Sequence, residues 1–393
     1  MSTPRLQPHY EITLGTQELI QQLVLSFPDI EIPLTQTANY AEWQIKNKRR
    51  VVWLCIVRDG VFCGVGIAVC YRMGTTRMQY WYTPYGPVIV VPNSANIRQE
   101  IECMSRAVRQ TINGIEESLS ALNHGSNTTV FIRTDATLYT SLPQKVKGKK
   151  VYQELVPQGI QKLMPRYRLS GSYFQPRAEW HISLKQSYAE ILAAMHHKTR
   201  YSIKLAEKKL AEKIVSYEIV TGKDILRHQK NFEVLMKETA GRDKFCMHDH
   251  AYYKAVFTTT SRSKAGFLIN VYEGIGDNRK LLVSNLIVYT ETSAYYLFGT
   301  SSNSGRNLMP TYLAQWKALE RSKRDGKIWY NFGGISTPSF PKFGWKGITD
   351  FKTKFGGEAR VHPFMYDVPI RRFRYVGYCL AKIISYIRSY ARN

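Results

Sequence analysis

The feature that most limits the possible folds of this chain is an order of elements that occurs twice. In the first half, the aromatic stretch 78–82 is followed by a turn at 84–87, an amphipathic segment and an apolar strand at 130–133. In the second half, the aromatic stretch 294–298 precedes a polar loop, another amphipathic segment and the strand 328–332. A strand–helix–strand order that recurs favours two α/β units of one architecture.

Both amphipathic segments have the spacing of a helix, with apolar residues every three or four positions. In the second half this spacing runs from Tyr312 to Leu319, and we expect that helix to end near Gly326. In the first half the apolar positions are Ile97, Ile101, Met104, Val108, Ile112, Ile115, Leu119 and Leu122. The strands expected upstream form one hairpin in each half, 51–57 with 61–71 around a turn at 58–60, and 267–272 with 281–289.

These elements predict an α/β (α+β) fold with two domains, each a mixed sheet flanked by helices. We place the first domain at 1–176, completed by about 358–370, the second at 177–357, and a C-terminal helix at 371–393. A single helix should open the second domain at Ser187, because Ser187 and Glu190 form a capping box.

The charge of the chain is strongly positive. Lys and Arg number 55 against 30 Asp and Glu, a formal net charge of +25. Such an excess attracts nucleic acid, anionic lipid or phosphorylated small molecules, although it also serves solubility. The expected helix after Ser187 concentrates cations, among them Lys198, Arg200, Lys204 and Lys208, which suits either phosphate contacts or a solvated helix face.

The tail 371–393 is basic and aromatic, with apolar residues close to one helical face. Val376, Leu380, Ile383, Ile384 and Ile387 form that face, and Arg371, Arg372, Arg374, Lys382, Arg388 and Arg392 supply charge. This pattern is typical of a helix lying on an anionic membrane surface. A helix docked on the protein's own surface would have the same pattern.

The six cysteines form no CxxC pair. We expect reduced thiols in a cytoplasmic protein, with a catalytic thiol as the weaker alternative. Residues 1–10 lack an apolar leader, and no stretch reaches the ~20 apolar residues of a membrane span.

The usual motifs for metals and cofactors are missing. His248 and His250 flank Asp249, but no further ligand stands at a telling distance, so we expect no metal. The sequence has no GxxxxGK[ST] loop and no GxGxxG after a strand. Residues 300–307 lack the paired glycines of an acetyl-CoA pyrophosphate turn, and we therefore expect no cofactor.

Several stretches, taken in order, resemble the FemABX peptidyltransferases over nearly the whole chain. The closest are 295–302, the helix through Trp316, 332–335 and 348–357, which ends in Phe351-Lys352-Thr353-Lys354-Phe355-Gly356-Gly357. Upstream stretches that fit are 175–176, 180–184, 198–200, 241–243 and 252–253, and more loosely 36–44 and 85–88.

The resemblance implies two GNAT-like domains and an aminoacyltransferase that forms cell-wall bridges. Its partners would be aminoacyl-tRNA and a peptidoglycan precursor, either UDP-MurNAc-pentapeptide or lipid II. The protein would act as a cytoplasmic monomer, with peripheral contact to the inner face of the plasma membrane through 371–393. Only 187–213 is available for the helical arm of some relatives, so we expect no such arm.

The resemblance also implies site residues. Lys352, next to Phe351, would stabilise the oxyanion of an ester aminolysis, since an ammonium is a compact point charge. Residues placed to contact the precursor are Arg242, Tyr252, Tyr253 and Tyr296, and more weakly Tyr82, Tyr85 and Gln44. Contacts to tRNA would come from Lys198, Arg200, Lys204 and Lys208. All of these tyrosines could instead be packed side chains.

Two departures from the family pattern affect proton transfer. Residues 88–92 are wholly apolar where relatives often carry an acid, and Asp367 is retained without the usual preceding Glu. We therefore expect the substrates, for example the terminal ribose hydroxyl of tRNA, to assist the proton transfer. The alternatives are a non-enzymatic protein that binds nucleic acid or membrane surfaces, and an N-acyltransferase of the same fold with another acyl donor.

Overall fold

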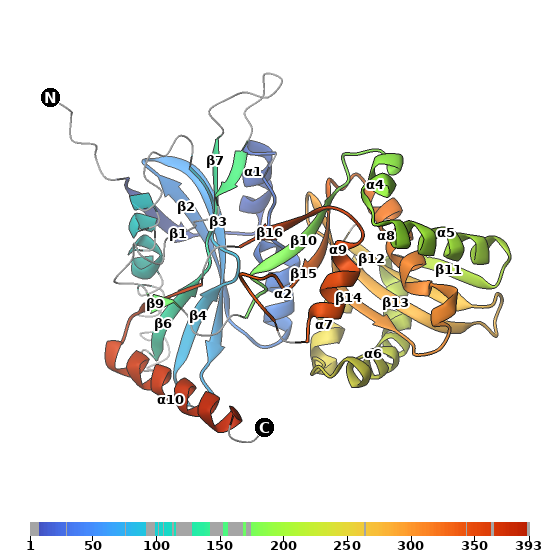
Figure 1. Cartoon of the computed structure of the whole chain (residues 1–393). Coiled ribbons are helices and arrows are strands. Elements are labelled where there is room, and N and C mark those ends of the chain that lie inside the picture. The colour runs from blue at the N-terminus through green and yellow to red at the C-terminus, as the bar shows by residue number, and fades with distance from the viewer. Residues whose placement is uncertain are drawn as a thin grey trace. The chain divides into compact units, whose positions relative to one another are not determined.

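The computed structural model describes residues 8–390 apart from 29, 75, 92–98, 101, 105, 112–113, 115–127, 142–151, 156–167, 170–173, 263–264, 343 and 363–364. The chain forms two compact units, each built on one mixed sheet (Figure 1). Unit 1 comprises Met1–Ile30, Thr35–Phe174 and Pro363–Asn393, and unit 2 comprises Glu31–Leu34 and Gln175–His362.

Within the described residues, the sheet of unit 1 has ten strands. Eight follow the order β8-β7-β5-β3-β4-β6-β17-β9, while β2 pairs with β3 and β1 with β2. Their bounds are β1 Tyr10–Leu14, β2 Val51–Arg58, β3 Val61–Arg72, β4 Gln79–Thr83, β5 Val88–Val90, β6 Thr129–Thr134, β7 Thr137–Ser141, β8 Tyr152–Leu155, β9 Arg168–Leu169 and β17 Tyr366–Pro369. β4 runs parallel to β6 and β5 to β7, whereas the other pairs are antiparallel. The predicted hairpin of β2 and β3 is confirmed.

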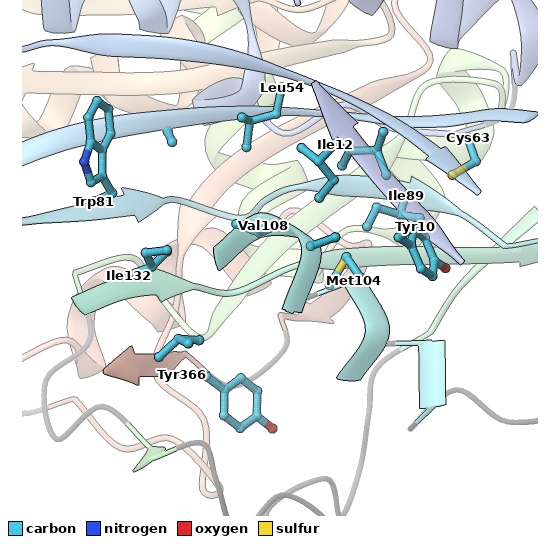
Figure 2. Packing of buried hydrophobic residues seen from close by; sticks show 14 of the residues in the cluster. Tyr10, Ile12, Leu54, Cys63, Trp81, Ile89, Met104, Val108, Ile132 and Tyr366 are labelled. Carbon is cyan, nitrogen blue, oxygen red and sulfur yellow. The ribbon is translucent and has the colours of Figure 1, made fainter. Parts of the chain in front are cut away.

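The helices described in unit 1 include α1 (Glu18–Ser26), α2 (Ala38–Lys46) and α10 (Arg372–Tyr390). The helix expected around 97–122 is helical at 99–100, 102–104, 106–111 and 114, and the rest lies outside the described residues. Its Met104 and Val108 face the sheet and pack with alternate strand residues such as Ile12, Leu54 and Ile132 (Figure 2). The apolar residues that recur every second position on the strands and every three or four positions on the helix thus pack together in one core.

The sheet of unit 2 has seven strands in the order β11-β12-β13-β14-β15-β10-β16. They are β10 Ala178–Ser183, β11 Val215–Val220, β12 Gly266–Glu273, β13 Lys280–Tyr289, β14 Ser293–Ser301, β15 Trp329–Gly334 and β16 Glu358–Val361. β14 and β15 run parallel, and the other described neighbours are antiparallel. The predicted strands at 267–272, 281–289, 294–298 and 328–332 are all present.

The helices of unit 2 are α4 Tyr188–Ala194, α5 His197–Ala211, α6 Gln229–Asp243, α7 His250–Thr260, α8 Pro310–Arg324 and α9 Lys346–Thr353, with short 3₁₀ turns η3 Gly222–His228 and η4 Arg306–Leu308. The capping box of Ser187 and Glu190 is confirmed at the start of α4. The prediction of a single helix starting at Ser187 is wrong, because two helices, α4 and α5, occupy this stretch. The chain becomes extended at Met195, which is buried in the core, and the His196 side chain caps α5.

The end of the chain divides between the two sheets. β16 pairs with β10 in unit 2, whereas β17 pairs with β6 in unit 1, so the stretch 358–370, expected with the first domain, is shared. α10 docks on unit 1 through Tyr375, which is buried, and Tyr378. No helix in the described part of the chain combines the length and apolar character required to cross a bilayer.

Candidate active site

The parallel strands β14 and β15 of unit 2 separate part-way along their length. The ladder between them ends where Tyr295 pairs with Asn331, although both strands continue. On its other side β15 pairs with β10, and there Glu179 lies opposite Gly334. In open α/β sheets, ligands bind at the carboxyl ends of strands where neighbours diverge. The backbone beyond Tyr295 and Asn331 is therefore the natural place to look for a site.

Lys352 reaches this place from the last turn of α9. Its Nζ donates a hydrogen bond to the carbonyl oxygen of Gly334 over 2.7 Å. A Cβ built on Gly333 would lie 3.8 Å from the same Nζ and 3.9 Å from the carbonyl oxygen of Tyr296. The ammonium thus lies beside both diverging strands, and the residue is only 6 % exposed.

Burial has a direct effect on the charge of Lys352. It lowers the pKa of the ammonium from 10.5 to about 8, and the negative charge of Glu179 limits the decrease. With a pKa of about 8, roughly nine in ten molecules carry the charged form at pH 7. The group is therefore a cation with little competing solvation, which is the property expected of an oxyanion stabiliser in a dry site.

The last residues of β15, which receive the Lys352 hydrogen bond, form a bulge that depends on glycine. Gly333 has a φ of +75°, a conformation that side chains with a Cβ rarely adopt. The Asn331 Oδ1 accepts a hydrogen bond from the Gly333 amide over 2.6 Å and so fixes this bulge. At the end of α9, Gly357 has a φ of +99°, and a Cβ there would lie 2.2 Å from the carbonyl oxygen of His181. The segment that connects α9 to β16 therefore runs close against β10.

Aromatic packing holds α9 in place. The Phe355 ring is fully buried and stacks on Tyr312 with centroids 5.9 Å apart. Phe351 is half-buried and makes edge contacts to Tyr312 at 5.5 Å and to Phe355 at 5.2 Å. The Trp180 indole donates a hydrogen bond of 2.6 Å to the Gly356 carbonyl. Phe351 thus contacts the aromatic cluster that positions the helix of Lys352.

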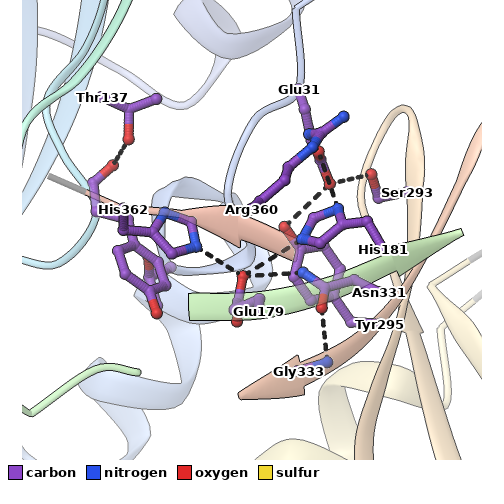
Figure 3. A network of polar contacts seen from close by, with 12 residues as sticks. Glu31, Thr137, Glu179, His181, Ser293, Tyr295, Asn331, Gly333, Arg360 and His362 are labelled. Atoms are coloured by element: carbon purple, nitrogen blue, oxygen red, sulfur yellow. Dashed lines mark hydrogen bonds and ion pairs between the residues drawn. The ribbon is translucent and has the colours of Figure 1, made fainter. Parts of the chain in front are cut away.

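A buried polar network lies on β10, β15 and β16 of the same sheet (Figure 3). The Glu179 Oε2 accepts hydrogen bonds from Asn331 Nδ2 over 2.9 Å and from His362 Nε2 over 3.0 Å. The His181 ring lies between two carboxylates, with Nε2 3.7 Å from Glu179 Oε2 and Nδ1 3.5 Å from Glu31 Oε2.

Glu31 extends this network. It forms an ion pair with Arg360 and accepts hydrogen bonds from Ser293 Oγ over 2.5 Å and Tyr295 Oη over 3.4 Å. Burial lowers the pKa of Arg360 to about 10. Burial alone would raise the pKa of Glu179, but hydrogen bonds and positive charge from His181 and His362 hold it well below the usual range of a carboxyl.

Sequence reasoning missed Glu31, Glu179, His181, Asn331 and His362. The available signal was local, since Glu179 and His181 stand two residues apart in a strand and therefore on one face. The other three come from distant segments, and the position of Glu31 before α2 gave no reason to place it in unit 2.

Arg242, predicted to contact phosphate, lies near the end of α6, and all five of its N–H donors are used within unit 2. They bond to the carboxylate of Asp243, the backbone and hydroxyl oxygens of Ser301, and the Asn303 side chain. Arg242 therefore ties α6 to the loop after β14. A phosphate would have to replace one of these partners.

The predicted tyrosines of unit 2 have different environments. Tyr253 is buried beside Phe298, whereas Tyr252 is half-buried and stacks on the exposed His248 at 4.2 Å. Tyr296 is half-buried, and burial raises its pKa to about 12. Its hydroxyl lies against Gly299, because a Cβ there would overlap it.

The three first-domain residues, Tyr82, Tyr85 and Gln44, are all buried in unit 1. The Tyr82 hydroxyl donates to Asp135 Oδ2 over 3.0 Å, and the Tyr85 amide donates to Asp135 Oδ1 over 2.6 Å. The Gln44 Oε1 accepts a hydrogen bond from Arg49. Asp135, which sequence reasoning missed, thus connects both tyrosines.

The four cations expected to contact tRNA, Lys198, Arg200, Lys204 and Lys208, are all exposed on α5. Arg200 donates hydrogen bonds to the carbonyls of Ala193 and Met195, and Lys208 lies 3.7 Å from Glu212. Across the described residues, no group of three or more His, Cys, Asp or Glu side chains is arranged to hold a metal ion.

Comparison with known proteins assigns the chain to a family. The FemAB family model matches residues 31–273 and 270–383. The chain belongs to the FemAB family. The resemblance to FemABX proteins is thereby confirmed, and Lys352 lies in a matched segment.

Relatives of this FemAB-family chain are distant in sequence. A lipid II:glycine glycyltransferase of Staphylococcus aureus is 21 % identical over 276 residues, which are 53 % of this chain and 63 % of the relative. The chain thus matches less than two thirds of the length of that relative.

Similarity to solved structures extends further along the chain. The crystal structure of FemX has a TM-score of 0.67 and 17 % identity, and the match covers 93 % of this chain and 98 % of that one. A tandem GNAT protein from the clavulanic acid pathway has a TM-score of 0.48 and 10 % identity, over 92 % and 98 % of the two chains. The predicted α/β fold of two domains, each with a mixed sheet flanked by helices, is confirmed.

Proposed function

We propose that this FemAB-family protein is a tRNA-dependent aminoacyltransferase of peptidoglycan-bridge formation. It would move an amino acid from aminoacyl-tRNA to the stem-peptide amine of a peptidoglycan precursor. The observation that carries the proposal is the buried Lys352 ammonium beside the diverging strands of a chain that matches the FemAB family. The similarity to a lipid II:glycine glycyltransferase supports a precursor of this class.

The chemistry requires no metal ion. The acceptor amine attacks the ester carbonyl, a C–N bond forms, and the carbonyl oxygen becomes an oxyanion that Lys352 Nζ can stabilise beside its bond to Gly334. Collapse breaks the ester C–O bond, and the ribose oxygen leaves with the proton that the amine loses. The reaction needs a positioned amine more than a protein nucleophile.

In this proposal the exposed cations of α5 contact the tRNA donor. Arg200, Lys204 and Lys208 recur every four residues and so lie on one helical face. Contacts between such cations and phosphates weaken steeply as salt rises. For the precursor, the half-buried Tyr252 and Tyr296 are more accessible than Tyr253, Tyr82, Tyr85 or Gln44.

Helix α10 suits a peripheral contact with the cytoplasmic face of an anionic membrane. Opposite its docked Tyr375 it exposes a row of large apolar side chains, namely Phe373, Val376, Leu380, Ile383, Ile384 and Ile387. The exposed Arg372, Arg374 and Lys382 lie on the same helix and complement anionic headgroups. Such a contact favours a lipid-linked acceptor.

A vesicle assay tests this part of the proposal. Leu380→Asp should abolish sedimentation of the protein with phosphatidylglycerol vesicles, while Ala381→Asp, which adds the same charge next to it on α10, should reduce it far less. Equal binding of both variants, or no binding by the native protein, would refute the membrane contact.

The activity itself is tested by mass spectrometry. The protein is incubated with a mixture of aminoacyl-tRNAs and either UDP-MurNAc-pentapeptide or lipid II, and the precursor should gain the mass of one aminoacyl residue. Activity with a CoA thioester and none with aminoacyl-tRNA would indicate an N-acyltransferase with another donor. Salt-sensitive tRNA binding without any product would indicate a binding protein.

A further inference from the structure

The buried carboxylate of Glu179 lies next to the Lys352 site but takes no part in the reaction described above. It is connected to the site in two ways. Its backbone pairs with Gly334, the residue whose carbonyl accepts the Lys352 hydrogen bond. Its side chain accepts a hydrogen bond from Asn331, whose own oxygen holds the Gly333 amide. Glu179 therefore pairs directly with Gly334 and is connected to Gly333 through Asn331.

The surroundings of Glu179 keep it ionised. Asn331 and His362 donate to its Oε2, and His181 adds a ring nitrogen at 3.7 Å. A carboxylate that receives several donors is stabilised in its charged form even when buried. The ring nitrogens of His181 each face one carboxylate, so the imidazole links Glu179 to Glu31.

A buried ammonium also needs a nearby negative charge. Lys352 is almost fully buried, and the protein hydrogen bond described for its Nζ goes to a neutral carbonyl. Without compensation, a buried amine loses its proton, because desolvation disfavours the charged form. Glu179 is the group whose charge opposes this effect at Lys352.

We propose that Glu179 is a positioning residue of the Lys352 site: its carboxylate is the counter-charge that keeps the Lys352 ammonium protonated, and through Asn331 it fixes the glycine bulge at the end of β15, where the Gly334 carbonyl accepts the hydrogen bond from the ammonium. The role of Lys352 in the reaction rests on the proposed function, but its ionisation does not. Charged or titratable groups near the pair include His181, His362, Glu31, Arg360 and Tyr295.

The first test measures ionisation without any substrate. The protein is labelled with [ε-¹³C]lysine, the Lys352 signal is assigned with Lys352→Met, and its titration is followed by NMR from pH 6 to pH 10.5. In Glu179→Gln the Lys352 midpoint should fall by at least one pH unit. The matched control Glu273→Gln, at an exposed position of the same unit, should leave it unchanged. An unchanged midpoint in Glu179→Gln would overturn the proposal.

A measurement on the native protein covers the case in which Glu179→Gln does not fold. With [δ-¹³C]glutamate, the Glu179 carboxyl signal, identified by its loss in Glu179→Asp, should shift with the same midpoint as Lys352. No step in the Glu179 signal as Lys352 titrates would refute the counter-charge role, because the two groups would not sense one another.

A third variant separates the two parts of the proposal. Asn331→Ala removes the link to the Gly333 amide but leaves the Glu179 carboxylate in place. It should lower kcat at least tenfold with little change in the midpoint of the Lys352 titration. Glu179→Gln should instead move the alkaline limb of the pH profile of kcat to lower pH. A purely structural Glu179 would change neither the limb nor the midpoint. The titrations need neither aminoacyl-tRNA nor a precursor. They can therefore refute the role of Glu179 even if aminoacyl transfer is established, and they can support it even if no transfer is found.

Discussion

Replacing Lys352 by Met should make the protein more stable while removing its activity. The side chain is similar in length and apolar, so it fits the same buried space. The pKa of Lys352 falls from 10.5 to about 8 in the folded protein, a difference worth about 3 kcal/mol of stability at neutral pH. Loss of the hydrogen bond to Gly334 offsets about 1 kcal/mol of this.

The net gain at pH 7 is therefore about 2 kcal/mol, or roughly 4–8 °C in the melting temperature of a unit of this size. The gain must depend on pH. The folded-state pKa is below the unfolded value, so between pH 8 and 10.5 the unfolded chain binds more protons and the native protein becomes more stable as pH rises. The advantage of Lys352→Met should thus shrink across this range.

Thermal and urea unfolding, followed by circular dichroism at pH 7 and pH 9.5, measure both effects. Lys354→Met is the matched control, because Lys354 is exposed just after the same helix and its replacement should change stability little at either pH. Aminoacyl transfer by Lys352→Met should fall by about 10²–10³, the usual cost of removing one oxyanion donor. A destabilised variant, or a gain that is equal at both pH values, would refute the view that Lys352 is a buried ammonium.

Three further predictions concern other parts of the chain. The kcat of the native protein should decline above about pH 8 as Lys352 loses its proton, and a profile that stays flat to pH 9.5 would contradict its role as a cation. Asp367→Asn in unit 1 should cost about 3–5 kcal/mol in urea unfolding, because it leaves the fully buried Arg133 without its bidentate partner; a loss below 1 kcal/mol would contradict this. Ser187→Ala should lower the free energy of unfolding by about 1 kcal/mol, because it removes the capping box with Glu190. An unchanged midpoint of urea unfolding would mean that the cap does not contribute to stability.

Much of the fold could be predicted from the sequence because its signals are local. The hairpin of β2 and β3, the aromatic strands β4 and β14 and the amphipathic α8 follow from periodicity and turn residues that lie within a few positions of one another. The capping box at Ser187 is of the same kind. The break between α4 and α5 was missed, since the burial of Met195 that causes it is a tertiary contact.

The sequence also pointed to Lys352, through the order of motifs around it, but it gave no information on the surroundings of the ammonium. Its burial and its lowered pKa follow from the packing of α9 against β10 and β15. Likewise, the sequence predicted an amphipathic helix in the C-terminal segment 371–393. Only the structure distinguishes the face that docks through Tyr375 from the apolar face that stays exposed.

The sequence by itself determined the repeated α/β architecture and the family and drew attention to Lys352, because these depend on short-range pattern and on order along the chain. The tertiary structure alone decided which charges meet. Glu31, Glu179, Asn331 and His362 come from four distant segments, and whether such groups share one buried site depends on strand pairing across the whole unit. Electrostatic energy depends on distance and burial, neither of which the linear sequence contains.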